Sequence, residues 1–288
     1  MRKYLINSIL AILVTTVAIL IYFSVYGVKT ESFNDLISDK IKEFNPKLSL
    51  DINDVFLKLN TKERSINIRT QNATIFIDRE FIKLSKIDLN LDILNFLRKE
   101  NSIKNIKITT DINKIKNFSD FINIYKFSIP RLLIFNQIKG GNITAEININ
   151  FKEKSTSDFT FDVNAKIRDA KLKILNEYKV EKINFDLNIK DRKYVIENTI
   201  FKNEGINFNS KKIVIKNLNG EYEIDGDLSN EKGLIDLKYL KKILNYQINF
   251  IDSKKILAET ENKFKFKIDS KKKIKDLNLS SKINFEEI

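Results

Sequence analysis

The pattern of hydrophobic positions begins with a mostly apolar run from Tyr4 to Tyr26 that contains neither charge nor proline. A helix needs about 20 apolar residues to cross the hydrocarbon core of a bilayer. Only a helix satisfies every backbone hydrogen bond within one such segment. Aromatic residues near both ends of the run suit the membrane–water interface. The run therefore predicts a membrane-spanning helix.

A cleaved signal peptide is the alternative for this segment. Its apolar region is usually about 7–15 residues long and is followed by small residues at the cleavage site. Here the run is longer, and Phe23 and Tyr26 stand where small residues would be expected. We therefore expect a retained anchor. Because Arg2 and Lys3 precede it, the positive-inside rule places the N-terminus in the cytoplasm and residues after about 28 outside, which is the periplasm of a Gram-negative bacterium.

A short amphipathic helix follows the anchor. Apolar residues recur at three- and four-residue spacing between Glu31 and Phe44, and Asn45-Pro46 ends the pattern. We interpret this helix as a cap on the end of the next sheet, with a neck near the membrane as the alternative.

After Pro46 the period changes from 3.6 to 2, which is typical of β-strands with one apolar face. The most regular strands are predicted at Ile143–Phe151 and Phe159–Ile167, with a turn at Gly140-Gly141 before them. Interruptions elsewhere predict separate short strands, and three segments have helical spacing. The three helical segments are Asp92–Arg98, Phe118–Tyr125 and Leu234–Tyr246. The remaining predicted strands are, in order, Leu48–Ile52, Val55–Leu59, Ser65–Arg69, Ile75–Ile77, Leu84–Leu91, Ile103–Ile108, Ala170–Ile174, Ile183–Ile189, Tyr194–Ile200, Ile206–Phe208, Ile213–Ile215, Tyr222–Ile224, Phe264–Ile268 and Leu277–Phe285.

The predicted fold is mainly β: one N-terminal transmembrane helix, then a meander of antiparallel strands with a few short helices. Strict alternation means that each strand buries one face only. That apolar face has two interpretations, an ordinary sandwich core or a surface left open to hold acyl chains. Both require the same alternation, and spacing alone favours the sandwich.

Composition removes most catalytic chemistry. The chain has no cysteine and no histidine, so it has neither disulfides nor the commonest general base and metal ligand. The net charge is +13, but lysines alternate with acids along the chain, which is typical of a solvated polar face. We expect a non-enzyme without metal or cofactor, and no nucleic-acid partner.

The order of these features resembles the AsmA-like superfamily, in particular its YhdP- and TamB-type proteins with a repeating β-groove. The resemblance covers essentially the whole chain, although family members are usually longer, so this sequence is similar to an N-terminal part or a short member. It rests on the anchor followed by FNDLISDKIKEF, LSLDINDVFLKLN, SINIRTQNATIFI, KLSKIDLNLDILNFLRKENSIKNIKI, IKGGNITAEININF and KNLNGEYEIDGDLS.

The resemblance implies a protein of the inner membrane and periplasm whose elongated, twisted sheet forms a groove. Residues 1–28 would be the cytoplasmic tip and anchor, 29–135 a β-rich region with short helices, and 136–288 the β-groove region. Phospholipids would move along the groove towards the outer membrane, with an outer-membrane or periplasmic protein as a possible partner. The implied groove lining is Ile143, Ala145, Ile147, Ile149, Phe151, Phe159, Phe161, Val163, Ile167, Phe185, Leu187 and Ile189.

Two other functions stay open. One is a non-catalytic, membrane-anchored assembly scaffold with a closed β-sandwich. The other is a component of a lipopolysaccharide bridge, since such proteins also combine one membrane span with a β-groove.

Overall fold

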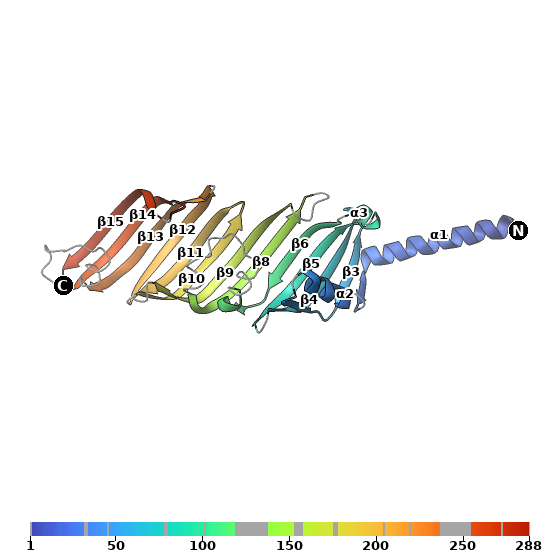
Figure 1. Ribbon diagram of the computed structural model, residues 1–288, viewed down its shortest axis with the longest axis horizontal. Coiled ribbons are helices and arrows are strands. Elements are labelled where there is room, and N and C mark those ends of the chain that lie inside the picture. Colours follow the sequence, from blue (N-terminus) through green and yellow to red (C-terminus); the bar gives the residue numbers. More distant parts are fainter. Residues whose placement is uncertain are drawn as a thin grey trace. The chain divides into compact units, whose positions relative to one another are not determined.

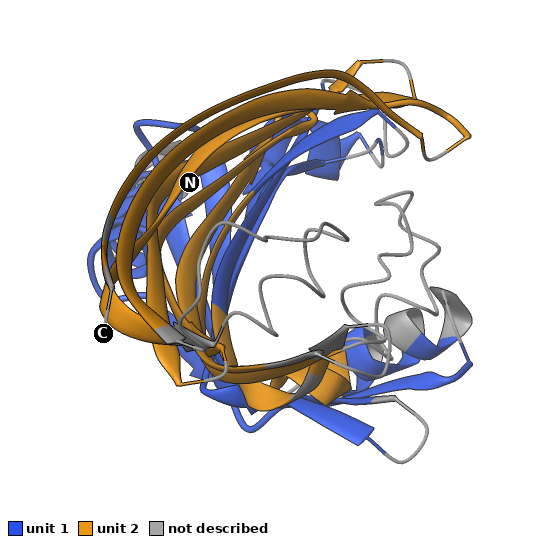
Figure 2. Ribbon diagram, turned by 90° about the vertical axis from the view of Figure 1, so that its left-hand side faces the viewer, with its two compact units in different colours: residues 1–113, 145–162 blue, residues 114–144, 163–288 orange. Residues whose placement is uncertain are grey.

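The computed structural model describes residues 2–31, 34–44, 46–77, 80–98, 100, 102–118, 138–152, 158–174, 178–203, 205–218, 220–236, 255–271 and 273–287 (Figure 1). The sequence-based fold class is confirmed: the chain is mainly β, with one long N-terminal apolar helix, a long antiparallel sheet and a few short helices. The chain divides into two compact units, 1–113 with 145–162, and 114–144 with 163–288 (Figure 2). Each is described separately below.

The N-terminal helix α1 (Arg2–Val25) has the length and composition of a membrane span. Its most apolar part, Asn7–Val25, has a mean hydropathy of 2.5 and is not buried against the rest of the protein. The hydroxyls of Thr15 and Thr16 donate to the carbonyls of Ala11 and Ile12, at 2.9 and 2.8 Å. These bonds let two polar side chains sit in an apolar helix without unmet donors.

Helix and sheet meet at a tight junction in which only Tyr26 and Gly27 separate α1 from β1 (Val28–Thr30). β1 pairs with β3 (Val55–Asn60). Gly27 has a φ of +71°, and a Cβ placed on it would lie 2.5 Å from the Phe56 ring and 2.6 Å from the Leu57 carbonyl oxygen. Both the left-handed backbone and the close approach require glycine here.

Unit 1 is built around two long strands, β4 (Ser65–Ile77) and β5 (Glu80–Asp92). Its strands pair in the order β1-β3-β4-β5-β6-β8, and each of these neighbouring pairs is antiparallel. β2 and β3 pair with successive parts of β4, so the break between the predicted strands Leu48–Ile52 and Val55–Leu59 interrupts one line of pairing. The other elements are α2 (Asn34–Phe44), β2 (Leu48–Asp51), α3 (Ile93–Leu97), β6 (Ile103–Thr110), β7 (Asn113–Lys114), β8 (Ile138–Phe151) and β9 (Phe159–Ile174), of which β7, β8 and β9 contribute to both units.

Unit 2 contains long antiparallel strands that pair in chain order from β10 to β15. Its ribbon shows strands that bend along their length (Figure 2). Asp191 and Arg192 join β10 to β11 with φ of 48° and 61°, which makes a tight two-residue hairpin. The strands are β10 (Tyr178–Lys190), β11 (Lys193–Asn203), β12 (Ile206–Leu218), β13 (Glu221–Asp236), β14 (Lys255–Ile268) and β15 (Ile274–Glu287).

The interruptions in alternation prove to be irregularities inside continuous strands. Asn72, Asp169, Asn198 and Asp276 lie within strands yet have φ of about +53°, in the left-handed region. The expected separation into short strands was therefore wrong in three places. The merged pairs are Ser65–Arg69 with Ile75–Ile77 in β4, Phe159–Ile167 with Ala170–Ile174 in β9, and Ile206–Phe208 with Ile213–Ile215 in β12.

Two other local expectations also differ from the structure. Gly140 and Gly141 lie within β8 rather than in a turn, and a Cβ on Gly141 would lie 2.6 Å from Ala170 Cα. Gly141 therefore allows close backbone approach, whereas Gly140 has open space around it. The helix expected from Leu234 is a strand as far as Asp236, and its remainder lies outside the described residues. Of the helix expected at Phe118–Tyr125 only Phe118 is described, and it lies in a helical turn.

We predict that Gly27→Ala destabilises the protein more than Gly220→Ala. Both glycines have positive φ, so both substitutions carry the backbone cost of about 1 kcal/mol. A methyl group at Gly27 also overlaps Phe56 and Leu57, which adds about 1–3 kcal/mol, whereas Gly220 has open space around it. Chemical denaturation of the full chain in detergent, followed by circular dichroism, measures the difference. Equal costs for the two substitutions would show that the junction is not tightly packed.

Candidate functional site

In unit 1 the register of five neighbouring strands sorts side chains onto two faces. Residues directly opposite each other in antiparallel strands share a face. Ile68 of β4 pairs with Leu89 of β5, and Leu89 pairs with Ile106 of β6. We define the apolar face of unit 1 by its two central rows, which are Leu57, Ile68, Leu89, Ile106 and Ile149, and Val55, Thr70, Ile87, Ile108 and Ile147.

This apolar face is only partly shielded from solvent. Val55 and Thr70 are buried, but every other member of the two rows is half-buried. Among the described elements of unit 1, the extensive contacts are those between hydrogen-bonded strands. The helices make further contacts, α1 with β3, α2 with β2 and α3 with β5. A closed sandwich core would bury both central rows against a second sheet. The half-buried rows thus leave apolar surface accessible to a ligand.

Unit 2 has an apolar face of the same kind. One row crosses six strands, and Gly226 stands in its middle. A Cβ on Gly226 would lie 3.0 Å from both Phe264 Cζ and Ile213 Cγ1, so neighbouring side chains cover this glycine. The ring centroids of Phe201 and Phe208 stack at 5.1 Å. The row consists of Leu187, Ile196, Ile213, Gly226, Phe264 and Leu279.

The residues implied by the family resemblance fall in both units. In unit 1, Ile147 and Ile149 lie in the two rows of the apolar face, Ala145 is buried on the same strand, and the Phe151 and Phe159 ring centroids are 5.9 Å apart. Phe161 is half-buried. In unit 2, Leu187 and Ile189 pair with Ile196 and Tyr194 of β11. The others there are Ile143 and Ile167, which are buried, and Val163 and Phe185, which are half-buried.

The sequence-based selection left out much of the same surface. Ile68, Leu89 and Ile106 are in register with Ile149, and Ile213 and Phe264 are in the row of Leu187. The alternation of apolar and polar residues predicts several of these strands. It does not show which strands pair or in which register, and both are needed to identify the residues that share a face.

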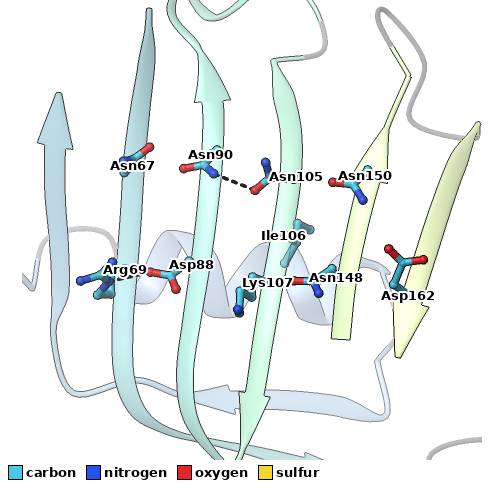
Figure 3. Close-up of a pocket in the computed structure, with 10 residues that line it drawn as sticks. All are labelled: Asn67, Arg69, Asp88, Asn90, Asn105, Ile106, Lys107, Asn148, Asn150 and Asp162. Atoms are coloured by element: carbon cyan, nitrogen blue, oxygen red, sulfur yellow. Dashed lines mark hydrogen bonds and ion pairs between the residues drawn. The ribbon is translucent and has the colours of Figure 1, made fainter. Parts of the chain in front are cut away.

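The opposite face of unit 1 carries amides and paired charges (Figure 3). Asn67, Asn90, Asn105 and Asn150 form one row across β4, β5, β6 and β8, and Asn90 Nδ2 donates to Asn105 Oδ1 at 2.7 Å. These side chains line a shallow depression of about 460 Å³. The remaining residues that line it are Arg69, Asp88, Lys107, Asn148 and Asp162, together with Ile106, whose register partners Leu89 and Ile149 define it as a member of the apolar face.

Asp88 is held between two cations on this polar face. Its carboxylate lies 2.5 Å from Arg69 Nε and 2.6 Å from Lys86 Nζ. Burial raises the pKa of Asp88, but the hydrogen bonds and charges of Lys86 and Arg69 together outweigh burial, so the pKa lies below its ordinary value. The charge of Asp88 is therefore neutralised by cations of the polar face itself.

A comparable network lies on the polar side of unit 2. Arg168 Nη2 donates to Asp186 Oδ1 at 2.7 Å, and Asn198 Nδ2 donates to Asp186 Oδ2 at 3.1 Å. These two hydrogen bonds, Arg168 first, lower the pKa of Asp186. Within the described residues, no group of three or more acidic side chains is placed to hold a metal ion.

No family model, curated protein or solved structure matches this chain. The fold and surfaces themselves define its class. It is a mainly β protein with an N-terminal helix able to span a membrane and an antiparallel sheet whose two faces differ in polarity.

We predict that the contribution of Asp88 to stability depends on pH. Because its folded pKa is lowered, that contribution is complete above the unfolded value of about 3.9 and is lost as pH falls through the folded pKa. Asp88→Asn should lower the free energy of unfolding by about 1 kcal/mol at pH 7 and by almost nothing at about pH 2. Denaturation at both pH values, with Asp51→Asn as the exposed control, measures this. A loss of equal size at both would contradict the ion-pair interpretation.

Proposed function

We propose that this protein is anchored in the inner membrane of a Gram-negative bacterium, exposes its sheet to the periplasm, and binds phospholipids by their acyl chains on the apolar face. In the wider form of the proposal, lipid moves along this face towards the outer membrane, where a partner protein receives it. The observation that carries the proposal is the in-register apolar face, whose rows are half-buried.

The energetics of acyl-chain binding fit this surface. Each CH₂ group that leaves water contributes about 0.8 kcal/mol, so an acyl chain on the rows can replace the second sheet of a sandwich. Almost every position of the rows adds an aliphatic or aromatic contact, the exceptions being Thr70 and Gly226, and adjacent strands are about 4.8 Å apart. Such a face recognises hydrocarbon without needing a headgroup site.

The N-terminal helix supports the membrane part of the proposal. Asn7–Val25 is long and apolar enough to cross a bilayer, and Arg2 and Lys3 favour a cytoplasmic N-terminus. The polar face, with its amides and ion pairs, suits water. A scaffold with a closed sandwich is less well supported, because it would bury the apolar rows of unit 1, most of whose members are half-buried.

We predict that two acidic substitutions on the apolar face of unit 1 lower the amount of lipid that the full chain binds. Leu89→Asp with Ile106→Asp changes an in-register pair, and Asn90→Asp with Asn105→Asp places the same charges on the same strands but on the polar face. Native mass spectrometry of the full chain, released from detergent with added phosphatidylethanolamine, should show as much bound lipid for the polar-face variant as for the wild type, and less for the apolar-face variant, which keeps only the apolar face of unit 2.

The milder variant Leu89→Ala with Ile106→Ala guards against unfolding, because it removes apolar contact without adding charge. It should bind several-fold less lipid while keeping the far-ultraviolet spectrum of the wild type. Absence of lipid from the folded wild-type protein, or equal binding by both acidic variants, would refute the proposal.

We also predict that the sheet lies on the outer side of the inner membrane. The chain has no cysteine, so Lys58→Cys, at an exposed position of β3, creates a single thiol. A membrane-impermeant maleimide should label it in intact spheroplasts of a Gram-negative host. Labelling only after the membrane is broken would place the sheet in the cytoplasm and contradict the proposed location.

A further inference from the structure

Helix α3 of unit 1 presents its apolar side chains to solvent. Leu94, Phe96 and Leu97 are 47%, 53% and 70% exposed. At about 100° per residue these three lie on one side of the helix, and Asn95 lies on the other. A surface helix of a soluble domain normally has the opposite orientation, with its apolar side against the core. A group of exposed large apolar residues is typical of a surface that binds a partner.

Hydrogen bonds fix this orientation of α3. The Asp92 carboxylate caps the start of the helix by accepting from the Asn95 amide at 3.0 Å. The Ile93 amide donates to the Arg64 carbonyl at 3.1 Å. The Glu100 amide donates to the Asn95 carbonyl at 2.9 Å. Both ends of the helix and the neighbouring turn therefore hold it in place, and its exposed apolar side is built into the fold.

The helix α3 lies at the end of the sheet that is close to α1. The first sheet residue after α1 is Val28, which pairs with Leu57. β3 continues for three residues to Asn60, about 10 Å further along the strand. Asn60 pairs with Ser65, and Ser65 pairs with Asp92, after which α3 begins. Figure 1 shows α3 at the end of unit 1 from which α1 projects.

This position is next to the surface of the membrane that α1 would span. The ring centroids of Tyr22 and Tyr26 are 5.4 Å apart at the C-terminal end of α1, and aromatic rings of this kind lie at the boundary between headgroups and hydrocarbon. Only Gly27 separates Tyr26 from β1, and its close approach to Phe56 restricts the junction. The sheet therefore starts at the bilayer surface, with α3 on the same side.

Charge contributes little to the surface around α3. Lys62, Arg64 and Arg98 are exposed in the two turns beside the helix, but Glu63 and Glu100 are exposed in the same turns. Positive and negative charges nearly balance, so the apolar side chains determine the partner. These side chains match hydrocarbon, and the long basic side chains beside them can reach lipid phosphates.

We propose that α3 inserts Leu94, Phe96 and Leu97 into the surface of the membrane that α1 spans. A single helical turn is too small to bind a bilayer alone, but α1 keeps it at the surface, where a weak second contact is effective. The inference rests on the proposed membrane anchor and deepens it, because the anchored sheet gains a second contact with the bilayer.

This contact brings the apolar face of unit 1 to the bilayer. Leu91 lies two residues before α3 begins, and it pairs with Ile66 of β4 and Ile103 of β6. Leu91 is also two residues from Leu89, so alternation places it on the apolar face. A lipid that leaves the bilayer beside α3 therefore meets this end of the apolar face first.

The test measures contact between α3 and lipid by fluorescence. The chain has no tryptophan, so Phe96→Trp introduces a single probe into α3. The full chain is reconstituted in vesicles of phosphatidylethanolamine and phosphatidylglycerol, with or without bromine near the start of the acyl chains, which quenches tryptophan on contact. The probe at position 96 should lose most of its emission in brominated vesicles. Phe81→Trp is the matched control, because Phe81 is also exposed but lies near the start of β5, whereas α3 follows its end; it should keep its emission.

Further variants of the Phe96→Trp chain identify the source of the quenching. Leu94→Ser with Leu97→Ser should remove most of it, whereas Ile112→Ser, at an exposed apolar position outside α3, should not. All three positions are exposed, so the far-ultraviolet spectrum should stay that of the wild type. Leu89→Asp with Ile106→Asp should leave the quenching unchanged, because the contact of α3 with the bilayer does not need lipid on the apolar face.

The outcomes separate this inference from the proposed function. Equal emission of the probe at position 96 in brominated and plain vesicles would overturn the contact of α3 and leave acyl-chain binding intact. Quenching that disappears with the acidic pair on the apolar face would come from lipid bound there, and would also overturn the contact. Equal quenching at positions 81 and 96 would show that the contact is not specific to α3. A chain that does not float with the vesicles would overturn both the contact and the membrane anchor.

Discussion

In-register pairing of alternating strands is the constraint on which the described surfaces depend. A shift of one residue would move every side chain of a strand to the other face. The registers keep Ile68, Leu89 and Ile106 on one face of unit 1 and Asn67, Asn90 and Asn105 on the other. Hydrophobic contact on one side and amide and ion-pair bonding on the other both favour the same register. Interactions on both faces therefore stabilise the register that keeps one face apolar and the other polar.

The left-handed residues inside the strands modify this constraint without breaking it. Asn72, Asp169, Asn198 and Asp276 each interrupt alternation while pairing continues. Asparagine and aspartate tolerate this backbone conformation better than other non-glycine residues. Their neighbours satisfy the displaced backbone groups; for example, Asn184 Oδ1 accepts from the amide of Asp169 at 2.9 Å. Such irregularities bend strands, as seen within unit 2 (Figure 2).

Alternation and apolar length predicted the fold class, the N-terminal helix, α2, α3 and most strands, because these signals are local. The continuity of β4, β9 and β12 could not be predicted, since a polar residue in a strand irregularity resembles one in a turn. The turn expected at Gly140-Gly141 was wrong for a different reason: Gly141 lies close to Ala170, a residue distant in sequence.

The central claim is that the apolar face contacts lipid while the polar face contacts water. The absence of native cysteine allows a direct measurement with a polarity-sensitive fluorophore attached at Ile106→Cys or Asn105→Cys, adjacent positions on opposite faces of β6. Phosphatidylethanolamine in detergent is then added to the labelled full chain. The account predicts a blue-shifted emission for the label at position 106 and no shift at position 105. Equal responses at both positions would contradict it.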